Sequence, residues 1–377
     1  FSCSAVLSAG RGALMCKKHL LQGKAFFMPG LFDSVRFGDL HLANRVVMAP
    51  LTRSRATADT RVPTAQMAKY YRQRASAGLI LSEATIVDRY GAGYEATPGI
   101  YTDEQTEAWK LVTKAVHEAG GTIVMQLWHC GRVSDPELLD GKMPVSASAV
   151  AIDGMVSRLK PPRRYVVPRP LELDEIPGIV AAFRKGAENA KTAGFDGVEA
   201  HGANGYLLDQ FLESASNKRT DAYGGSVENR ARLLLEVTDA LCEVWRPGRV
   251  GVHLSPRGES HSMGDSDKLA TFTYAACELG KRGIAFIFAR EHQGADSIAP
   301  RLKEAFGGPL IANEAFTRES AIEAVKTGAA DAVAFGKDYI ANPDLVLRLK
   351  KGAPLNKWDE TTFYDGGEKG YTDYPAL

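Results

Sequence analysis

The chain has 377 residues, of which 45% are hydrophobic and 24% charged, a composition typical of globular proteins and unlike collagen-like, coiled-coil or disordered ones. Its 46 basic and 45 acidic residues leave a net charge of +1, which excludes a broad electrostatic surface for nucleic acid or an anionic membrane. The five cysteines are widely spaced and form no CxxC pair, so neither a disulfide framework nor a zinc knuckle is indicated. We therefore expect a cytoplasmic protein, monomeric or homodimeric, that acts on a small molecule.

The first residues differ in character from the rest. The stretch before Met28 is basic, and no acidic residue precedes Asp33. We expect residues 1–30 to be an N-terminal extension that is disordered or an artefact of the assigned start, with a transit peptide as the alternative. Residues 31–377 are predicted to form a single domain. No run approaches the roughly 20 apolar residues that a membrane helix needs.

From residue 44 onward, short apolar runs alternate with longer stretches of helical period. Strands are predicted at 45–48, 79–85, 122–128, 197–201, 250–255, 284–289, 310–313 and 332–335. Helices are predicted at 64–77, 103–119, 174–193, 227–244, 267–282, 297–306, 318–326 and 343–350. Thr102 and Thr317 stand where N-caps are expected, and Gly78 and Gly120 where left-handed C-terminal caps are expected. Eight such units predict an α/β fold, a (β/α)₈ TIM barrel.

Three further segments are expected to complete the barrel. Residues 32–44, with Gly38 and Asp39 between two apolar pieces, predict a short hairpin that closes the bottom of the barrel. Residues 130–173 interrupt the third βα unit and are rich in Pro, Ser and Arg, so we expect this insertion to cap the C-terminal mouth. The tail from residue 354 carries three tyrosines and is expected to pack against the body of the protein.

In a TIM barrel the chemistry lies at the C-terminal ends of the strands. Gly336 and Lys337 follow the eighth predicted strand. The glycine allows close backbone approach and the lysine supplies a cation, which indicates a phosphorylated ligand. A solvated lysine beside an ordinary turn glycine is the alternative.

The densest group of polar residues is His201, Asn204 and Tyr206, after the fourth strand. Helical geometry would not bring all three together, but Gly202 and Gly205 permit a loop that does. His and Asn can both donate to one oxygen, and a tyrosine stays protonated at neutral pH. The group predicts an oxyanion site with a proton donor; three structural polar side chains are the alternative.

Long motifs follow one another along residues 31–377: NRVVMAPLTR at 44–53, QLWHCGR at 126–132, GVEAHGANGYLLDQF at 197–211, NKRTDAYGGSVENR at 217–230, DAVAFGKDYIANPDL at 331–345 and GYTDYP at 370–375. In these motifs the chain resembles the old yellow enzyme family, FMN-dependent ene-reductases that include plant oxophytodienoate reductases and bacterial enoate and nitroester reductases. The resemblance implies that residues 31–377 are an FMN-binding barrel with the flavin across its mouth.

The resemblance also implies an NAD(P)H oxidoreductase reaction. NADPH or NADH would reduce FMN, and flavin N5 would then give hydride to the activated C=C bond of an α,β-unsaturated carbonyl or nitro compound. His201 and Asn204 would hold the substrate oxygen, and Tyr206 would donate the proton. The implied substrate wall is Tyr94, Trp128 and Tyr364. The implied cofactor residues are Pro50, Leu51, Thr52 at the flavin C4 carbonyl, Gln126 at the pyrimidine edge, His253, Asn313, Glu314, Ala315, Gly336 and Lys337.

Three positions depart from the family pattern. His253 and Lys337 stand where the family generally has arginine, and Glu314 where it has a small residue. A carboxylate at position 314 is expected to repel the phosphate unless it turns outward. These departures leave open a non-catalytic or weakly active flavin-binding homologue. A metal-dependent barrel hydrolase is a further alternative, although His129, His201 and His253 form no HxH or HExxH motif and we expect no metal site.

Overall fold

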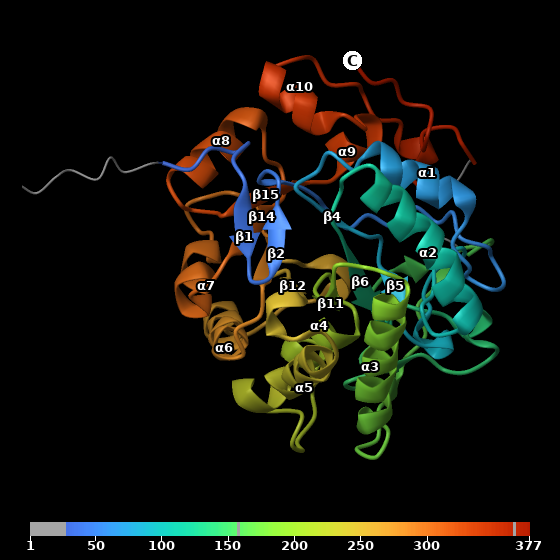
Figure 1. Ribbon diagram of the computed structural model, residues 1–377. Helices are drawn as coiled ribbons and strands as arrows, with labels where there is room; N and C mark the ends of the chain where they lie inside the picture. The colour runs from blue at the N-terminus through green and yellow to red at the C-terminus, as the bar shows by residue number, and fades with distance from the viewer. Residues whose placement is uncertain (1–27, 157–158, 365–366) are drawn as a thin grey trace, which may run out of the picture.

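The computed structural model describes residues 28–156, 159–364 and 367–377, so the expectation for residues 1–27 lies outside the described residues. Within those ranges, parallel strands form a closed barrel in chain order (Figure 1). The strands are β3 (Val46–Met48), β4 (Leu79–Leu81), β6 (Ile123–Trp128), β11 (Gly197–Gly202), β12 (Val250–Leu254), β13 (Phe286–Arg290), β14 (Leu310–Asn313) and β15 (Ala332–Phe335). β15 pairs with β3 and closes the ring, while β5 (Thr85–Ile86) pairs with the upper part of β6. The predicted TIM barrel is confirmed.

The helices form an outer layer around the strands (Figure 1). They are α1 (Ala65–Gln73), α2 (Asp103–Glu118), α3 (Ile176–Thr192), α5 (Val227–Trp245), α6 (Lys268–Lys281), α7 (Ala299–Phe306), α8 (Arg318–Lys326) and α10 (Leu345–Lys351). Two short helices were not predicted: α4 (Leu207–Leu212) follows β11, and α9 (Lys337–Ala341) follows β15. Single-turn 3₁₀ helices are η1 (Arg89–Gly91), η2 (Pro136–Leu139), η3 (Pro247–Arg249), η4 (Ser260–Ser262) and η5 (Glu360–Thr362).

Most helix boundaries follow from their capping residues. Thr102 and Thr317 both form the capping box in which the hydroxyl accepts a hydrogen bond from the backbone N–H three residues later. Gly120 has a φ of +77°, as a left-handed cap requires. The same expectation for Gly78 is wrong, because its φ is not positive. A Cβ there would lie 1.9 Å from the carbonyl oxygen of Asn44, so this glycine permits a close contact between two backbone segments.

The bottom of the barrel is closed by the predicted hairpin. β1 (Val35–Phe37) and β2 (Leu40–Leu42) pair antiparallel around the Gly38–Asp39 turn. Phe37 is fully buried and packs on the ring of Phe286, with ring centroids 6.3 Å apart. The hairpin shares one apolar cluster with the inward-facing residues of the strands, which are Val47, Leu79, Val124 and Ile311 among others. Because apolar side chains fill this end of the barrel, a ligand site must lie at the other end, where the strands have their carboxyl ends.

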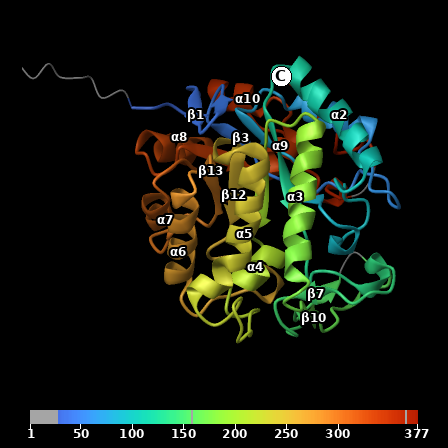
Figure 2. The ribbon, with the colours of Figure 1, turned by 60° about the horizontal axis from the view of Figure 1, so that its bottom comes forward.

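The insertion after the third barrel strand lies at that opposite end (Figure 2). β7 (Val145–Ser146) pairs with β10 (Arg169–Pro170), and β8 (Met155–Val156) pairs with β9 (Arg163–Arg164). Ile152 and Tyr165 of this insertion pack into one cluster with Trp128 at the end of β6. The insertion thus supports the wall of the mouth.

The C-terminal tail packs against α1. The ring of Tyr371 is fully buried and stacks on Tyr70 at a centroid distance of 4.1 Å. The guanidinium group of Arg53 donates to the carbonyl oxygens of Phe363 and Gly370, each at 2.8 Å. These contacts hold the tail beside the loop that follows β3. Across the described ranges, no helix combines the length and the apolar character that a membrane span requires.

Candidate active site at the barrel mouth

A cavity of about 610 Å³ opens at the carboxyl ends of the strands. Its volume is typical of a pocket for a cofactor or a small molecule. Ten of the predicted site residues line it: Pro50, Leu51, Asn204, His253, Asn313, Glu314, Ala315, Gly336, Lys337 and Tyr364. Thr52 lines an adjoining cavity of about 420 Å³ that shares Pro50, Leu51, Lys337 and Tyr364 with the first. The structure therefore gathers these residues, which are distant in sequence, at one mouth.

The predicted loop after β11 is present and brings its polar residues together. Asn204 and Gly205 have φ angles of +58° and +82°, and this left-handed turn ends at Tyr206, the first residue before α4. The Asp209 carboxylate accepts a hydrogen bond from the Gly205 N–H at 2.9 Å and fixes the turn. As a result, the rings of His201 and Tyr206 meet edge to face at 5.0 Å.

An aromatic wall stands beside this loop. The Trp128 ring stacks on Tyr94 at 5.6 Å and meets Tyr206 edge-on at 4.8 Å. The Tyr94 and Tyr206 hydroxyls share a hydrogen bond of 3.1 Å. Burial raises the pKa of both phenols well above 10, so both are neutral at pH 7 and hold a transferable proton. Tyr364 lies outside this wall, 45% exposed, where it lines the cavity from the tail.

The two histidines that face the mouth are neutral. Burial, and then the nearby Arg290 cation, lower the pKa of His201 to about 3. Burial, His201 and Arg290 hold the pKa of His253 well below its usual range. The two rings stack at a centroid distance of 5.1 Å. Neither imidazole therefore contributes a charge at pH 7.

Gln126 fixes the direction of the His253 proton. The Gln126 Nε2 group donates to Glu199 Oε2 at 2.7 Å and lies 3.0 Å from His253 Nδ1. Because an amide nitrogen only donates, His253 Nδ1 accepts and the single ring proton sits on Nε2. That buried N–H has no hydrogen-bond partner within the described residues, and neither does the buried Nδ1 of His201. Both atoms are available to a bound molecule.

Glu199 is a buried acid that the sequence analysis did not identify. It lies on β11 two residues before His201, and its second carboxyl oxygen is buried without a partner in the described chain. Burial raises its pKa to about 8, so the carboxyl is mostly protonated at pH 7. Its spacing of two from His201 places both on the inward face of the strand, a signal that the sequence does contain.

The Glu314 carboxylate pairs with the guanidinium group of Arg290 and also contacts His292. Glu314 follows β14 with a φ of +102°, and Ala315 follows with +58°. Its carboxylate lies 3.1 Å from Arg290 Nε and 3.2 Å from His292 Nε2. The carboxylate that we expected to repel a phosphate is thus turned toward a guanidinium group. The sequence analysis did not identify Arg290 and His292 as site residues. A signal for Arg290 was present: Phe286, Phe288 and Arg290 alternate along β13, so their side chains lie on the same face of the strand.

Lys337 begins α9 directly after Gly336, as the sequence analysis placed it. Its ammonium group lies 2.7 Å from the Glu360 carboxylate, and its side chain is 54% exposed. The rings of Trp358 and Phe363 lie within 6 Å of the Nζ atom. The lysine is a solvent-accessible cation at the rim of the cavity, and Trp358 is a cavity residue that was not predicted. Among the residues with described positions, no group of three or more His, Cys, Asp or Glu side chains is arranged to hold a metal ion.

Comparison with known proteins gives consistent matches over almost the whole chain. Residues 30–356 match the model of the NADH:flavin oxidoreductase / NADH oxidase family. A probable flavin mononucleotide-dependent alkene reductase from Leishmania infantum is 46% identical, covering 90% of this chain and 95% of that protein. The 12-oxophytodienoate reductase 2 of Arabidopsis thaliana is 42% identical, covering 92% and 96%.

Solved structures agree with these matches. The old yellow enzyme homologue from Zymomonas mobilis superposes with a TM-score of 0.90 at 45% identity, covering 93% of this chain and all of that one. Morphinone reductase in complex with tetrahydroNAD superposes with a TM-score of 0.89 at 48% identity, covering 93% and 98%. At 45–48% identity, these matches establish family membership as well as the fold.

Replacing Glu199 by Gln should change how stability depends on pH. The folded-state pKa of about 8 lies above the unfolded value near 4.5, so the folded protein binds more protons between these values and its free energy of unfolding falls as pH rises. The glutamine side chain of the variant stays neutral throughout this range. Between pH 5 and pH 8, the free energy of unfolding of the wild type should therefore fall by about 3 kcal/mol relative to that of Glu199→Gln, as measured by urea denaturation.

The exposed Glu323 of α8 offers a matched control. Glu323→Gln should follow the wild-type pH dependence, because this carboxylate is on the helix surface. Parallel curves for the wild type and Glu199→Gln would show that Glu199 is ionised in the folded protein.

Proposed function

Since the chain belongs to the NADH:flavin oxidoreductase / NADH oxidase family, whose members are FMN-dependent oxidoreductases, we propose that it reduces the activated C=C bond of α,β-unsaturated carbonyl or nitro compounds with NADPH or NADH as reductant. One observation carries this proposal: the end of β11 and the loop that follows it bring His201 and the neutral phenol Tyr206 into ring contact and place Asn204 between them in the chain, at the edge of the cavity. A carbonyl or nitro oxygen and a carbon that accepts a proton are the groups such an arrangement binds.

The residues present fit FMN. The cavity of about 610 Å³ is large enough for a flavin, and His253, which lines it, has a buried Nε2 atom that carries the ring proton and has no hydrogen-bond partner in the described chain. The carbonyl groups and ring nitrogens of an isoalloxazine ring are suitable acceptors for that proton. Lys337 supplies a cation for the phosphate after β15, where TIM barrels commonly bind phosphate. Pro50, Leu51 and Thr52 form the loop that borders both cavities.

When bound, FMN supplies the hydride. The chain's own residues bind the substrate and deliver the proton. His201 and Asn204 donate to the substrate oxygen, on which negative charge builds as the C=C bond is reduced, and each such donor contributes roughly 3 kcal/mol of transition-state stabilisation. Tyr206 delivers its phenolic proton to the neighbouring carbon. Tyr94, hydrogen-bonded to Tyr206 at 3.1 Å, is placed to return a proton to it.

The remaining site residues shape the pocket. Tyr364 lines the cavity from the tail, and the stacked rings of Trp128 and Tyr94, which lie outside the cavity lining, support Tyr206 from behind through the Trp128 contact and the Tyr94 hydrogen bond. The nicotinamide reductant would enter through the same mouth; a nicotinamide compound is also bound in the tetrahydroNAD complex of morphinone reductase. NADPH and NADH both remain candidate reductants.

A non-catalytic flavin-binding homologue is the second candidate, because His253 and Glu314 depart from the family pattern at cofactor positions. The contacts of Glu314 weaken that interpretation. Its carboxylate is paired with the guanidinium group of Arg290, so it does not add an uncompensated negative charge to the mouth. The alternative of a metal-dependent hydrolase is not supported, because the chain belongs to a family of flavin oxidoreductases.

Removing the charge of Lys337 tests the phosphate position. We expect Lys337→Ala to weaken FMN binding by about 10-fold or more and to leave riboflavin binding unchanged, because only FMN carries the phosphate. Fluorescence quenching of each flavin by the apoprotein gives both dissociation constants. Glu360→Gln is the matched control: it frees Lys337 from its ion pair and should tighten FMN binding about 2-fold. Equal losses for FMN and riboflavin would place the phosphate elsewhere.

Tyr206→Phe tests the proton donor. Oxidation of the reduced protein by 2-cyclohexenone should slow by about 10²- to 10⁴-fold, because the enone must be protonated by a general acid. Reduction of the protein by NAD(P)H needs no general acid and should stay nearly unchanged. Stopped-flow absorbance separates the two steps. Tyr94→Phe keeps the Tyr206 phenol and should slow the enone step much less. An unchanged enone step in Tyr206→Phe would assign the proton to another group or to water.

A further inference from the structure

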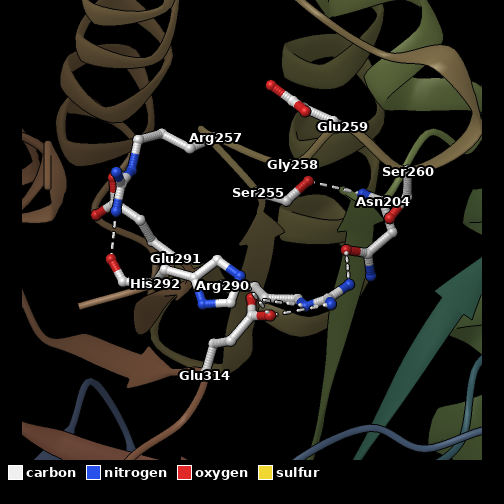
Figure 3. A pocket seen from close by; sticks show the side chains of 10 residues that line it. All are labelled: Asn204, Ser255, Arg257, Gly258, Glu259, Ser260, Arg290, Glu291, His292 and Glu314. Carbon is white, nitrogen blue, oxygen red and sulfur yellow. Dashed lines mark hydrogen bonds and ion pairs between the residues drawn. The ribbon is translucent and has the colours of Figure 1, made fainter. Parts of the chain in front are cut away.

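Arg290 occupies a central place at the mouth that the proposed reaction does not yet use. It is the last residue of β13 and lines both the main cavity and a side pocket of about 270 Å³ (Figure 3). Its Nε atom lies 3.1 Å from Glu314 Oε2, and its Nη1 atom donates to Asn204 Oδ1 at 2.9 Å. The guanidinium group therefore bridges the loop after β14 and the loop after β11.

The backbone of Asn204 is already fixed on both sides. Its N–H donates to Ser255 Oγ at 2.7 Å, and its carbonyl oxygen accepts from His261 Nδ1 at 2.8 Å. Its φ of +58° is a left-handed conformation that asparagine tolerates better than most residues. Only the side-chain torsions are left to decide which end of the amide faces the cavity.

The bond from Arg290 decides that orientation. A guanidinium group has donors and no acceptor, so the amide atom that faces it must be the oxygen, Oδ1. The other amide atom, Nδ2, carries two protons and takes no part in this bond; Figure 3 shows the bond from Arg290 running to the oxygen. No side chain or backbone group in the described ranges accepts from Nδ2. The asparagine thus presents donors, and no acceptor, to a molecule in the cavity.

We propose that Arg290 is a positioning residue, which locks the amide of Asn204 with its NH₂ group toward the substrate oxygen. This inference rests on the proposed function, in which Asn204 binds that oxygen. Without Arg290 the amide is free to turn by 180° and to present its own oxygen, which would repel the oxygen of the substrate.

Glu314 in turn holds the Arg290 guanidinium group in position and is itself in contact with His292. The carboxylate of Glu314 contacts Arg290 through both oxygens, at 3.1 and 3.4 Å, and also contacts His292 at 3.2 Å. Two contacts to one carboxylate fix the plane of a guanidinium group, which a single ammonium group would not achieve. Glu314 therefore has a use at a position where its φ of +102° would suit glycine better.

The surroundings of Arg290 agree with this role. Its charge reaches His201 and His253, since it contributes to the lowered pKa of both imidazoles. The guanidinium group therefore acts electrostatically on the second predicted donor, His201, as well as by contact on Asn204. Its neighbour Arg257 makes a different set of contacts, to Glu291 and Asp296, and none to Asn204 in the part of the chain that the structure describes.

A double-mutant cycle tests the proposal. The FMN-loaded wild type, Arg290→Met, Asn204→Ala and the double variant are titrated with cyclohexanone, a neutral ketone with one acceptor oxygen and no C=C bond. The shift of the flavin absorption band gives the dissociation constant. We expect about 5-fold weaker binding for Arg290→Met, about 10-fold for Asn204→Ala, and a double variant no weaker than Asn204→Ala alone, because Arg290 acts through Asn204.

Two further variants keep the test sharp. Arg290→Lys keeps the charge and a donor for Asn204 but loses the two-point contact with Glu314, so it should recover only part of the binding that Arg290→Met loses. Arg257→Met, the matched control in the side pocket, should leave the dissociation constant unchanged. Both also show whether loss of a guanidinium group at this rim disturbs the fold, which the flavin content of each variant reports.

Different failures have different meanings. Losses that multiply in the double variant would overturn the proposal, since Arg290 would then act on the ligand or the flavin independently of Asn204. Unchanged binding in Arg290→Met, with a loss in Asn204→Ala, would overturn it as well. Unchanged binding in Asn204→Ala would instead remove the substrate-oxygen role of Asn204 from the proposed function, and the positioning role with it.

Discussion

Closure of the parallel barrel is the constraint on which the site depends. When β15 pairs with β3, the carboxyl ends of all the barrel strands meet on one rim, and residues as far apart in sequence as Leu51 and Gly336 border one cavity. The hairpin of β1 and β2 fills the other end with apolar side chains, so polar groups at the floor of the mouth are shielded from water on the lower side. Each strand then needs only one or two polar residues at its end to build the site.

The mouth separates neutral polar groups from permanent charges. Deep in the barrel, His201, His253 and the carboxyl of Glu199 are neutral at pH 7 because they are buried. The charged groups, Arg290 with Glu314 and Lys337 with Glu360, lie at the rim and are partly exposed. Hydrogen-bond donors that are neutral and held by neighbours can stabilise a developing negative charge without reorganisation. Because Glu314 and Glu360 are each paired with a cation, neither carboxylate adds an unbalanced negative charge that would repel the charge developing on the substrate.

Much of this architecture could be predicted from sequence. Strand and helix periodicity indicated the barrel, Gly38 and Asp39 indicated the hairpin, and the glycines around Asn204 indicated the loop that presents His201 and Tyr206. Two features could not be predicted, for physical reasons. The pairing of Arg290 with Glu314 joins neighbouring strands 24 residues apart, and its geometry depends on the barrel register. The protonation of Glu199 depends on complete burial, which only the assembled barrel produces.

The central claim is that this mouth passes a hydride and a proton to an electrophilic alkene. The most direct test is anaerobic: the FMN-loaded protein is reduced with NADPH or NADH, 2-cyclohexenone is added, and the flavin absorbance is followed. We expect the flavin band to bleach with the reductant and to return with the enone, while about one cyclohexanone forms per flavin. A flavin that stays reduced in the presence of the enone, or that the nicotinamides never reduce, would contradict the claim.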